Sequence, residues 1–252
     1  MAGEAPILLV PGLDGTGLLF YRQVPLLARR RPVTAIRLRD DARSMDELIS
    51  DLDVSVRAAA PDGRPVVMMG ESFGGALSLS YALAHPARVS RLVILNSFPC
   101  FGPQARLWLG YHLLKATPWG MMRLVRRLTA WRMHSPHTGR DEIRRFHTLM
   151  RETTREGYLS RLRILRGYDV RDRLPTLQAP VLYLAADQDH LVPSVEQARL
   201  MGSLTARSTV TVLRGHGHIC LIAPDVDLAA LLDEWMSADS PADALALDGA
   251  LG

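Results

Sequence analysis

Short apolar runs alternate along this chain with longer segments whose apolar positions recur at helical spacing. The runs have the length of strands and are apolar at nearly every position, as expected for strands covered on both faces. They lie at Ile7–Val10, Val33–Leu38, Val66–Met69, Leu92–Leu95, Val181–Ala185 and Val210–Leu213. Because helices are expected between them, right-handed crossovers and parallel pairing follow. The pattern therefore predicts an α/β fold with a mostly parallel sheet flanked by helices.

Helices are predicted for the segments between these runs. The clearest is Ser44–Ala60, where Ser44 and Glu47 have the spacing of a capping box and apolar positions follow at helical spacing. The segment Leu18–Arg30 also reads as a helix, which Pro25 is expected to kink or divide. Two further helices are predicted, one that follows the turn Gly70–Gly75 and ends at Ala84, and one at Asp225–Met236.

One long segment, residues 98–173, interrupts the alternation. It contains no run typical of a strand and reads as several helices. A helical insertion between two strands is most simply a cap that lies over one end of the sheet. We therefore expect residues 1–97 and 174–237 to form the core, residues 98–173 a helical cap, and residues 238–252, rich in Ala, Asp and Gly, a poorly ordered tail.

The predicted cap is rich in basic residues. Its arginines far outnumber its acidic residues and include Arg123, Arg126, Arg127, Arg144, Arg145, Arg161 and Arg163. One interpretation is a set of solvated helix faces. The other is a positive rim that attracts an anionic substrate or an acidic partner.

The amino-acid composition is typical of a globular protein that folds without disulfides or a metal. The chain has 252 residues, of which 48% are hydrophobic and 22% charged, and such a chain buries a large core without disulfides or a structural metal. Its cysteines, Cys100 and Cys220, are far apart and are interpreted as reduced thiols. The histidines are scattered without the spacing of a metal site, so we expect no metal and no cofactor.

Charge and hydropathy bear on partners and location. The net charge of +4 comes without a recognisable basic module, which argues against a nucleic-acid partner. The sequence shows no secretory signal and no apolar run of about 20 residues, so we expect no membrane span. With so few cysteines, a cytoplasmic location is expected.

The pentapeptide Gly70-Glu71-Ser72-Phe73-Gly74 matches G-x-S-x-G and lies between a predicted strand and a predicted helix. This is the setting of a nucleophile elbow, a sharp turn that pushes the serine into the site and whose neighbours must lack bulk. From Pro6 to about Trp235 the chain resembles the α/β-hydrolase superfamily, in particular serine esterase-like members with a helical cap. The resemblance implies an eight-stranded sheet, of which the first two strands are not recognised here, and a triad in the chain order serine, acid, histidine.

The resemblance places the acid after the strand Val181–Ala185, where Asp187 and Asp189 are both candidates. The stretch from Asp189 to Pro193 resembles the loop in which the family's aspartate orients the histidine, so Asp189 is favoured and Asp187 is read as a turn residue. The histidine is expected after the last strand. There His218 precedes an apolar stretch as in the family and is favoured, with His216 as the alternative.

The expected triad is thus Ser72, Asp189 and His218. Acyl transfer by serine also needs backbone N–H groups that stabilise the oxyanion. Phe73, directly after the nucleophile, supplies one of them. By the resemblance the second lies in the glycine-rich turn after the first strand, where Leu13 is the expected donor although Pro11 stands at the family's usual histidine.

The leading hypothesis is a carboxylic ester hydrolase that forms an acyl-enzyme on Ser72 and acts on a small-molecule ester. The first alternative is a thioesterase or acyltransferase with the same triad, whose basic cap would meet an acidic carrier protein or coenzyme A phosphates. A ligand-binding receptor without turnover is the alternative from another class, and the complete triad argues against it.

Overall fold

Six parallel strands form a single sheet in the computed structural model, which describes residues 4–101, 111–112, 115–121 and 133–238. The strands are β1 (Ile7–Val10), β2 (Val33–Ala35), β3 (Val66–Glu71), β4 (Val89–Leu95), β5 (Val181–Ala186) and β6 (Ser208–Leu213). Their order across the sheet is β2-β1-β3-β4-β5-β6, and every neighbouring pair is parallel. All six predicted runs form strands, and the predicted α/β class is confirmed.

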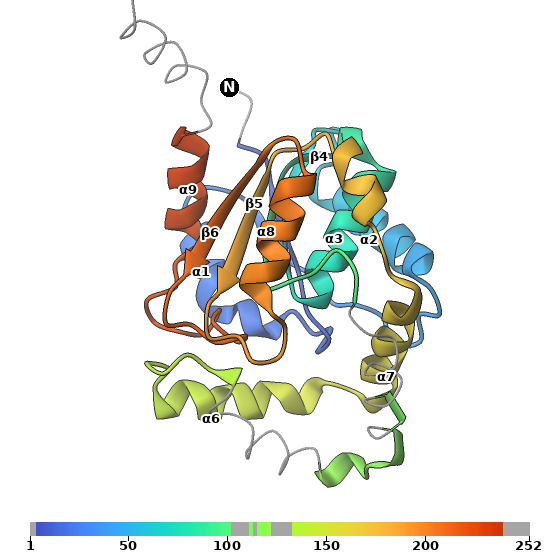
Figure 1. Cartoon of the computed structure of the whole chain (residues 1–252), viewed down its shortest axis with the longest axis vertical. Coiled ribbons are helices and arrows are strands. Elements are labelled where there is room, and N and C mark those ends of the chain that lie inside the picture. The colour runs from blue at the N-terminus through green and yellow to red at the C-terminus, as the bar shows by residue number, and fades with distance from the viewer. Residues whose placement is uncertain (1–3, 102–110, 113–114, 122–132, 239–252) are drawn as a thin grey trace, which may run out of the picture.

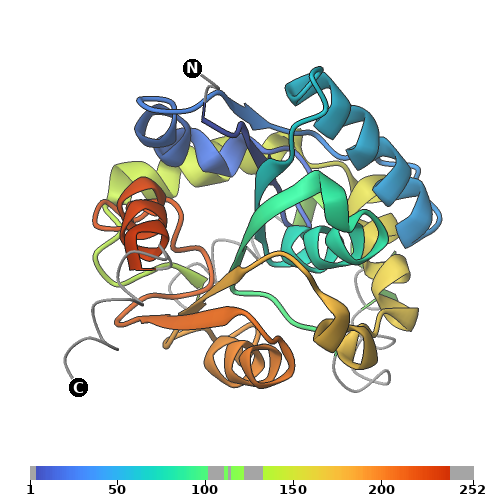
Figure 2. The same cartoon turned by 90° about the horizontal axis from the view of Figure 1, so that it is seen from above.

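Helices cover both faces of this sheet (Figure 2). Successive strand side chains point to opposite faces, so β1 sends Leu8 and Val10 into one layer and Ile7 and Leu9 into the other. The first layer contains α2 (Met45–Ala59), α3 (Phe73–Ala84) and α8 (Ser194–Leu204). The second contains α1 (Gln23–Leu27) and α9 (Leu228–Ala238). Burial on both faces is the reason that the central strands β1, β3 and β5 are nearly continuously apolar, whereas the edge strands β2 and β6 are partly exposed.

The helix ends show local sequence signals. Ser44 precedes α2 and its Oγ accepts a hydrogen bond from the N–H of Glu47 at 3.2 Å, as the predicted cap requires.

The predicted helix Leu18–Arg30 is divided, but the division lies before Pro25. A 3₁₀ helix, η1 (Leu18–Arg22), leads into α1, where Pro25 occupies the first turn. Proline is tolerated there because the first N–H groups of a helix have no intrahelical acceptor.

The segment predicted as a cap contains helices and, in its described residues, only isolated β-bridges rather than a strand. Its described elements are η3 (Trp119–Met121), α6 (Arg140–Leu149), η4 (Met150–Glu152), α7 (Arg155–Ile164) and η5 (Leu165–Gly167), followed by η6 (Arg171–Thr176); η2 (Pro86–Arg88) precedes β4. In Figure 1, α6 lies across the end of the sheet to which the strands point. Phe146 of α6 packs there in a cluster with Leu19, Ile219 and Ile222.

Some expectations fall on residues outside this description. They include Arg123, Arg126 and Arg127 of the predicted basic cap, and the predicted tail apart from residue 238, which ends α9. Within the described ranges, no helix is both long enough and apolar enough to cross a membrane.

Candidate active site

Ser72 lies on a sharp turn between β3 and α3. Its backbone has φ 52° and ψ −117°, a conformation that residues other than glycine rarely adopt. The turn is packed so closely that a Cβ on Gly70 would overlap the carbonyl oxygen of Gly74, and one on Gly74 would overlap that of Val10. The two glycines of the pentapeptide are therefore required by close backbone packing, and the strain at Ser72 is held by its surroundings.

The structure brings Ser72, His218 and Asp189 together from three separate loops. Nε2 of His218 lies 3.2 Å from Oγ of Ser72, and Nδ1 lies 2.6 Å from Oδ2 of Asp189. The side chains of His218 and Asp189 are 5% and 0% exposed. The three groups form one buried hydrogen-bonded chain from carboxylate to imidazole to hydroxyl, with the spacing that proton transfer from a serine requires.

The charges in this chain are set by the contacts of Asp189. Burial raises the pKa of its carboxyl, but the hydrogen bond from His218 and the attraction to that ring, together with bonds from Ser194 and Val192, bring it below the usual range. Oγ of Ser194 donates to Oδ2 at 2.5 Å, and the N–H groups of Leu191 and Val192 donate to Oδ1. Asp189 is thus an ionised carboxylate fixed in orientation by four donors, which include His218.

The two alternative residues have other partners. Oδ1 of Asp187 accepts a hydrogen bond from the N–H of Gly215 at 2.6 Å, which joins the two loops that carry the acid and the histidine. Nδ1 of His216 lies 2.9 Å from Oγ of Ser135, in the segment that precedes α6. Among these candidates in the described residues, Asp189 and His218 contact each other, and His218 in turn contacts Ser72.

Asn96 supports the histidine loop and was not singled out from the sequence. It follows β4 directly and has a φ of 47°. Its Nδ2 donates to the carbonyl oxygen of His218 at 2.8 Å, and its Oδ1 accepts the N–H of Ala186 at 2.8 Å. A polar residue directly after a buried strand was the available signal, because the carboxyl ends of parallel strands meet at one edge of the sheet.

The two expected oxyanion donors lie on segments that pack against each other. Phe73 is the first residue of α3, where an N–H has no acceptor within the helix. Leu13 lies in the turn after β1, which the N–H of Gly15 closes by donating to the carbonyl oxygen of Gly12 at 3.0 Å. The carboxylate of Asp14 is bonded to Thr16 within the same turn and so supports it. A Cβ on Gly74 would also meet the carbonyl oxygen of Pro11, which places the turn directly against the elbow.

Glu71 is a second carboxylate in the site. It is 8% exposed, and its Oε1 lies 3.6 Å from Nε2 of His218. A Cβ on Gly12 would overlap its other carboxylate oxygen, so that glycine makes room for it. Burial raises the pKa of the Glu71 carboxyl to about 7; attraction to His218 opposes this shift, and repulsion by Asp14 and Asp189 adds to it. The sequence showed Glu71 only as one of the two variable positions of the pentapeptide.

The arginines of the predicted basic rim differ in their surroundings. Arg161 is wholly buried, so the interpretation of this residue as part of a solvated face or an exposed rim is wrong. Arg144 is paired with Asp141, and the guanidinium of Arg145 lies over the ring of Tyr21. Arg163 is exposed and contacts the hydroxyl of Tyr111 at 3.2 Å.

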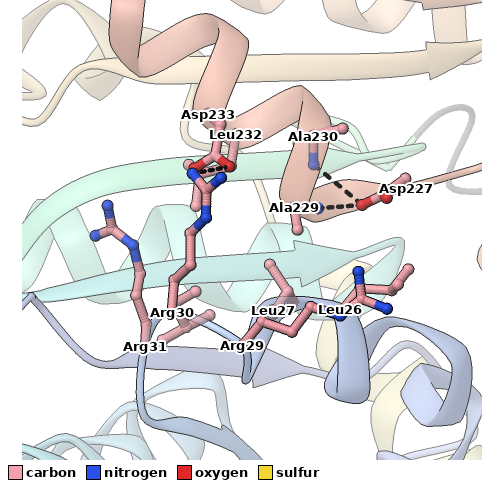
Figure 3. A pocket seen from close by; sticks show the side chains of 11 residues that line it. Leu26, Leu27, Arg29, Arg30, Arg31, Asp227, Ala229, Ala230, Leu232 and Asp233 are labelled. Carbon is pink, nitrogen blue, oxygen red and sulfur yellow. Dashed lines mark hydrogen bonds and ion pairs between the residues drawn. The ribbon is translucent and has the colours of Figure 1, made fainter.

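A cluster of possible metal ligands and a surface pocket are two further features of the described residues. His137, His216 and Asp225 bring one ligand atom each to within 4.8 Å of one another, but His137 and Asp225 are exposed and we assign them no ion. A pocket of about 210 Å³ lies between α1 and α9 (Figure 3). Arg30 in that pocket is paired with Asp233 at 2.6 Å, and the pocket is lined by none of Ser72, Asp189 and His218.

Comparisons with known proteins agree with this architecture. The sequence model of the alpha/beta hydrolase fold family matches residues 5–223. A Caulobacter vibrioides relative that carries the name carbamate hydrolase RutD is 30% identical over 232 residues, which cover 86% of this chain and 85% of that protein. A pimeloyl-[acyl-carrier protein] methyl ester esterase from Stenotrophomonas maltophilia is 29% identical, with 96% of this chain and 97% of the relative covered.

Solved structures show the same fold. The enol-lactonase from Burkholderia xenovorans superposes with a TM-score of 0.79 at 19% identity, over 93% of this chain and 92% of that one. The family match extends over most of the chain, from before β1 to beyond the histidine loop, and the relatives named above support a hydrolase activity. The chain therefore belongs to the alpha/beta hydrolase fold family.

Proposed function

We propose that this chain is a serine hydrolase that cleaves carboxylic esters through an acyl-enzyme on Ser72. The observation that carries the proposal is the buried hydrogen-bonded chain from Asp189 through His218 to Ser72, on a strained elbow next to the turn that contains Leu13. Asp187 and His216 are not part of it, because each is bonded elsewhere.

The first half of the reaction transfers the acyl group to the enzyme. His218 takes the proton of Ser72 while Oγ forms a bond to the ester carbonyl carbon, since a neutral hydroxyl is a poor nucleophile without a base in contact. Asp189 stabilises the imidazolium and holds its tautomer. The N–H groups of Leu13 and Phe73 donate to the oxyanion. The C–O bond to the alcohol then breaks, and His218 returns the proton to the leaving oxygen.

The second half repeats these steps with water. His218 removes a proton from a water molecule, whose oxygen attacks the acyl carbon bound to Ser72. The same backbone donors stabilise the second oxyanion, and the ester bond to Ser72 breaks as His218 returns the proton to Oγ. The products are a carboxylic acid and the restored serine.

We also propose that residues 98–173 form a cap over this site. Its support is the packing of α6 and η4, whose Phe146 and Met150 belong to one buried cluster with Leu19, after the turn that contains Leu13, and Ile219, next to His218. A cap in this position would shape the acyl and alcohol sites and exclude water from the intermediate.

The variant Ser72→Ala tests the proposal most directly. It should abolish turnover of small activated esters and stoichiometric labelling by a fluorophosphonate probe, while the unfolding transition stays cooperative. His216→Gln is the matched control for His218→Gln, because only His218 contacts Ser72. Full turnover by Ser72→Ala would overturn the proposal, and absence of labelling in the wild type would favour a receptor without turnover.

A second candidate keeps the triad and changes the substrate to an acyl group borne by an acidic carrier. Two observations favour it. The Stenotrophomonas relative is named for an acyl-carrier-protein ester. Exposed arginines also gather on the segment next to the site, namely Arg140, Arg144, Arg151 and Arg155.

Rates for matched acyl ester, acyl thioester and carbamate substrates, at low and high salt, separate these classes. A steep loss of rate with salt for the carrier-bound acyl group alone would favour the acidic partner, because salt screens exposed charges. A preference for the carbamate would replace the ester proposal.

A further inference from the structure

The buried guanidinium of Arg161 joins α7 to the turn that contains the proposed oxyanion donor. Its Nε donates to the carbonyl oxygen of Leu13 at 3.0 Å, and Nη2 donates to that of Asp14 at 3.2 Å. On the other side, Nη1 donates to the carbonyl oxygen of Arg39 at 3.2 Å, and Oδ1 of Asp40 lies 3.4 Å from both Nη atoms. The side chain is 0% exposed.

Two glycines leave room for this arrangement. A Cβ on Gly15, in the turn, would overlap the guanidinium of Arg161, and a Cβ on Gly157, one turn earlier in α7, would overlap the carboxylate of Asp40. The hydroxyl of Ser160 donates to the carbonyl oxygen of Ala42, so two successive side chains of α7 bond to the segment around residues 39–42. The turn after β1 and α7 are therefore shaped around one side chain.

We infer that Arg161 is a positioning residue for the oxyanion hole. The inference rests on the proposed function. The carbonyl and the N–H of Leu13 flank one Cα, so a bond that fixes the carbonyl restricts the rotation that would turn the N–H away. The planar fork of an arginine holds two successive carbonyls, Leu13 and Asp14, at the same time.

The buried charge of Arg161 is compensated by nearby acidic groups. Burial lowers the pKa of the guanidinium, whereas Asp40 and Asp14 oppose that shift. An apolar side chain would avoid the burial of a charge, but it would leave the carbonyls of Leu13 and Asp14 without this donor, and such a loss destabilises the arrangement that buries them. The buried charge of Arg161 therefore serves to organise the backbone of the turn.

The test compares Arg161→Met with Arg163→Met. Arg163 is an exposed arginine two residues later on the same helix, whose contact is the hydroxyl of Tyr111. We expect Arg161→Met to lower kcat for a small activated ester about a hundredfold, the effect of losing one oxyanion donor, with little change in KM. Affinity for a boronic acid transition-state analogue should fall by a similar factor. Arg163→Met should change neither quantity.

A role limited to anchoring α7 gives a different result. It predicts a lower Tm for Arg161→Met, but unchanged kcat per folded molecule and unchanged affinity for the analogue, and that outcome overturns the inference. If Arg161→Met fails to fold, Arg161→Lys replaces it, because lysine keeps the charge and loses the fork. A reduced kcat in that variant supports the inference, and a wild-type kcat overturns it.

Chemical rescue tests the role of the guanidinium, and the Ser72→Ala variant separates this inference from the proposed function. Methylguanidinium added to Arg161→Ala should restore part of kcat and leave Arg163→Ala unaffected, and absence of rescue in a folded Arg161→Ala counts against the inference. An inactive Ser72→Ala combined with a fully active Arg161→Met overturns this inference alone. Full activity of Ser72→Ala instead overturns the proposed function.

Discussion

Oε1 of Glu71 lies 3.6 Å from Nε2 of His218, at the opposite ring nitrogen from Asp189. The imidazole is thus in contact with two carboxylates, both largely buried. Burial opposes the charged form of His218, but the hydrogen bond to Asp189, the attraction to Asp189 and the attraction to Glu71 together raise the pKa of the ring above its usual value. Once Glu71 is ionised, as the pH rises through about 7, its negative charge adds to that of Asp189 in stabilising an imidazolium at His218.

The variant Glu71→Gln should shift the pH profile of the reaction. Glutamine has nearly the same shape and no charge, so the pKa of His218 should fall. Because the proposed base acts in its neutral form, the acidic limb of the kcat/KM profile should move to lower pH. The rate on the plateau should fall about tenfold, because the transition-state imidazolium loses one anionic neighbour.

Profiles of wild type, Glu71→Gln and the exposed control Glu234→Gln measure this effect. The control should follow the wild type at every pH. An unchanged acidic limb in Glu71→Gln would show that Glu71 does not act on the histidine.

The same carboxylate should make stability depend on pH. Its pKa is raised from 4.5 to about 7, chiefly by burial. Between these values the folded chain holds a proton that the unfolded chain has released, so the free energy of unfolding falls as the pH rises through this window. Above about pH 7 the free energy of unfolding of the wild type is lower by the full amount, roughly 3 kcal/mol for a pKa shift of this size.

The glutamine side chain in Glu71→Gln does not titrate, so the free energy of unfolding of this variant lacks this decrease with pH. We expect its stability relative to the wild type to be higher at about pH 8 than at about pH 5, as measured by urea unfolding at both values. A relative stability that is equal at the two pH values would contradict a buried, titrating Glu71.

Asp189→Asn should lower kcat by roughly 10³–10⁴-fold, because an amide cannot hold the imidazole in the reactive tautomer or stabilise its charge. Asp187→Asn is the matched control, two residues earlier in the same loop. Its carboxylate accepts the N–H of Gly215, so its loss should affect the loop more than the chemistry. A loss of kcat in Asp187→Asn as large as that in Asp189→Asn would mean that the acid is wrongly assigned.

The central strands could be predicted from sequence because both faces of the sheet are buried there, which makes β1, β3 and β5 nearly continuous apolar runs. Their ends were less predictable because pairing depends on the neighbouring strand. The run Val33–Leu38 pairs only as far as Ala35, since β1 ends at Val10 and the N–H of Leu38 donates instead to Gly15. No local signal in the run itself marks that point.

The candidate site also contains residues that could be predicted from the sequence and residues that could not. The elbow around Ser72 is contiguous in sequence, so strand, turn, serine and helix could be recognised together. Arg161 could not be recognised, because its neighbours along α7 include exposed arginines and its partners, such as Leu13 and Asp40, lie more than a hundred positions earlier. Glu71 looked interchangeable because its proximity to His218 arises only in the folded chain.

Gly15→Ala should damage both stability and activity. Gly15 has a φ of 70°, which alanine adopts only with strain, and an added Cβ would overlap the guanidinium of Arg161. We expect the free energy of unfolding to fall by about 1–3 kcal/mol. Activity should also fall, because the displaced guanidinium no longer holds the carbonyls of Leu13 and Asp14. Gly167→Ala is the control, since an added Cβ there meets nothing within 4 Å.

Urea unfolding and kcat, measured on both glycine variants, separate strain from positioning. Strain alone lowers stability and leaves kcat and affinity for a transition-state analogue unchanged in the folded molecules. Displacement of Arg161 lowers all three quantities in Gly15→Ala. The double variant Gly15→Ala with Arg161→Met should then lose little further kcat, because residues that act through one contact are not additive. A fully additive loss of kcat would place the effect of Gly15 outside the contact with Arg161.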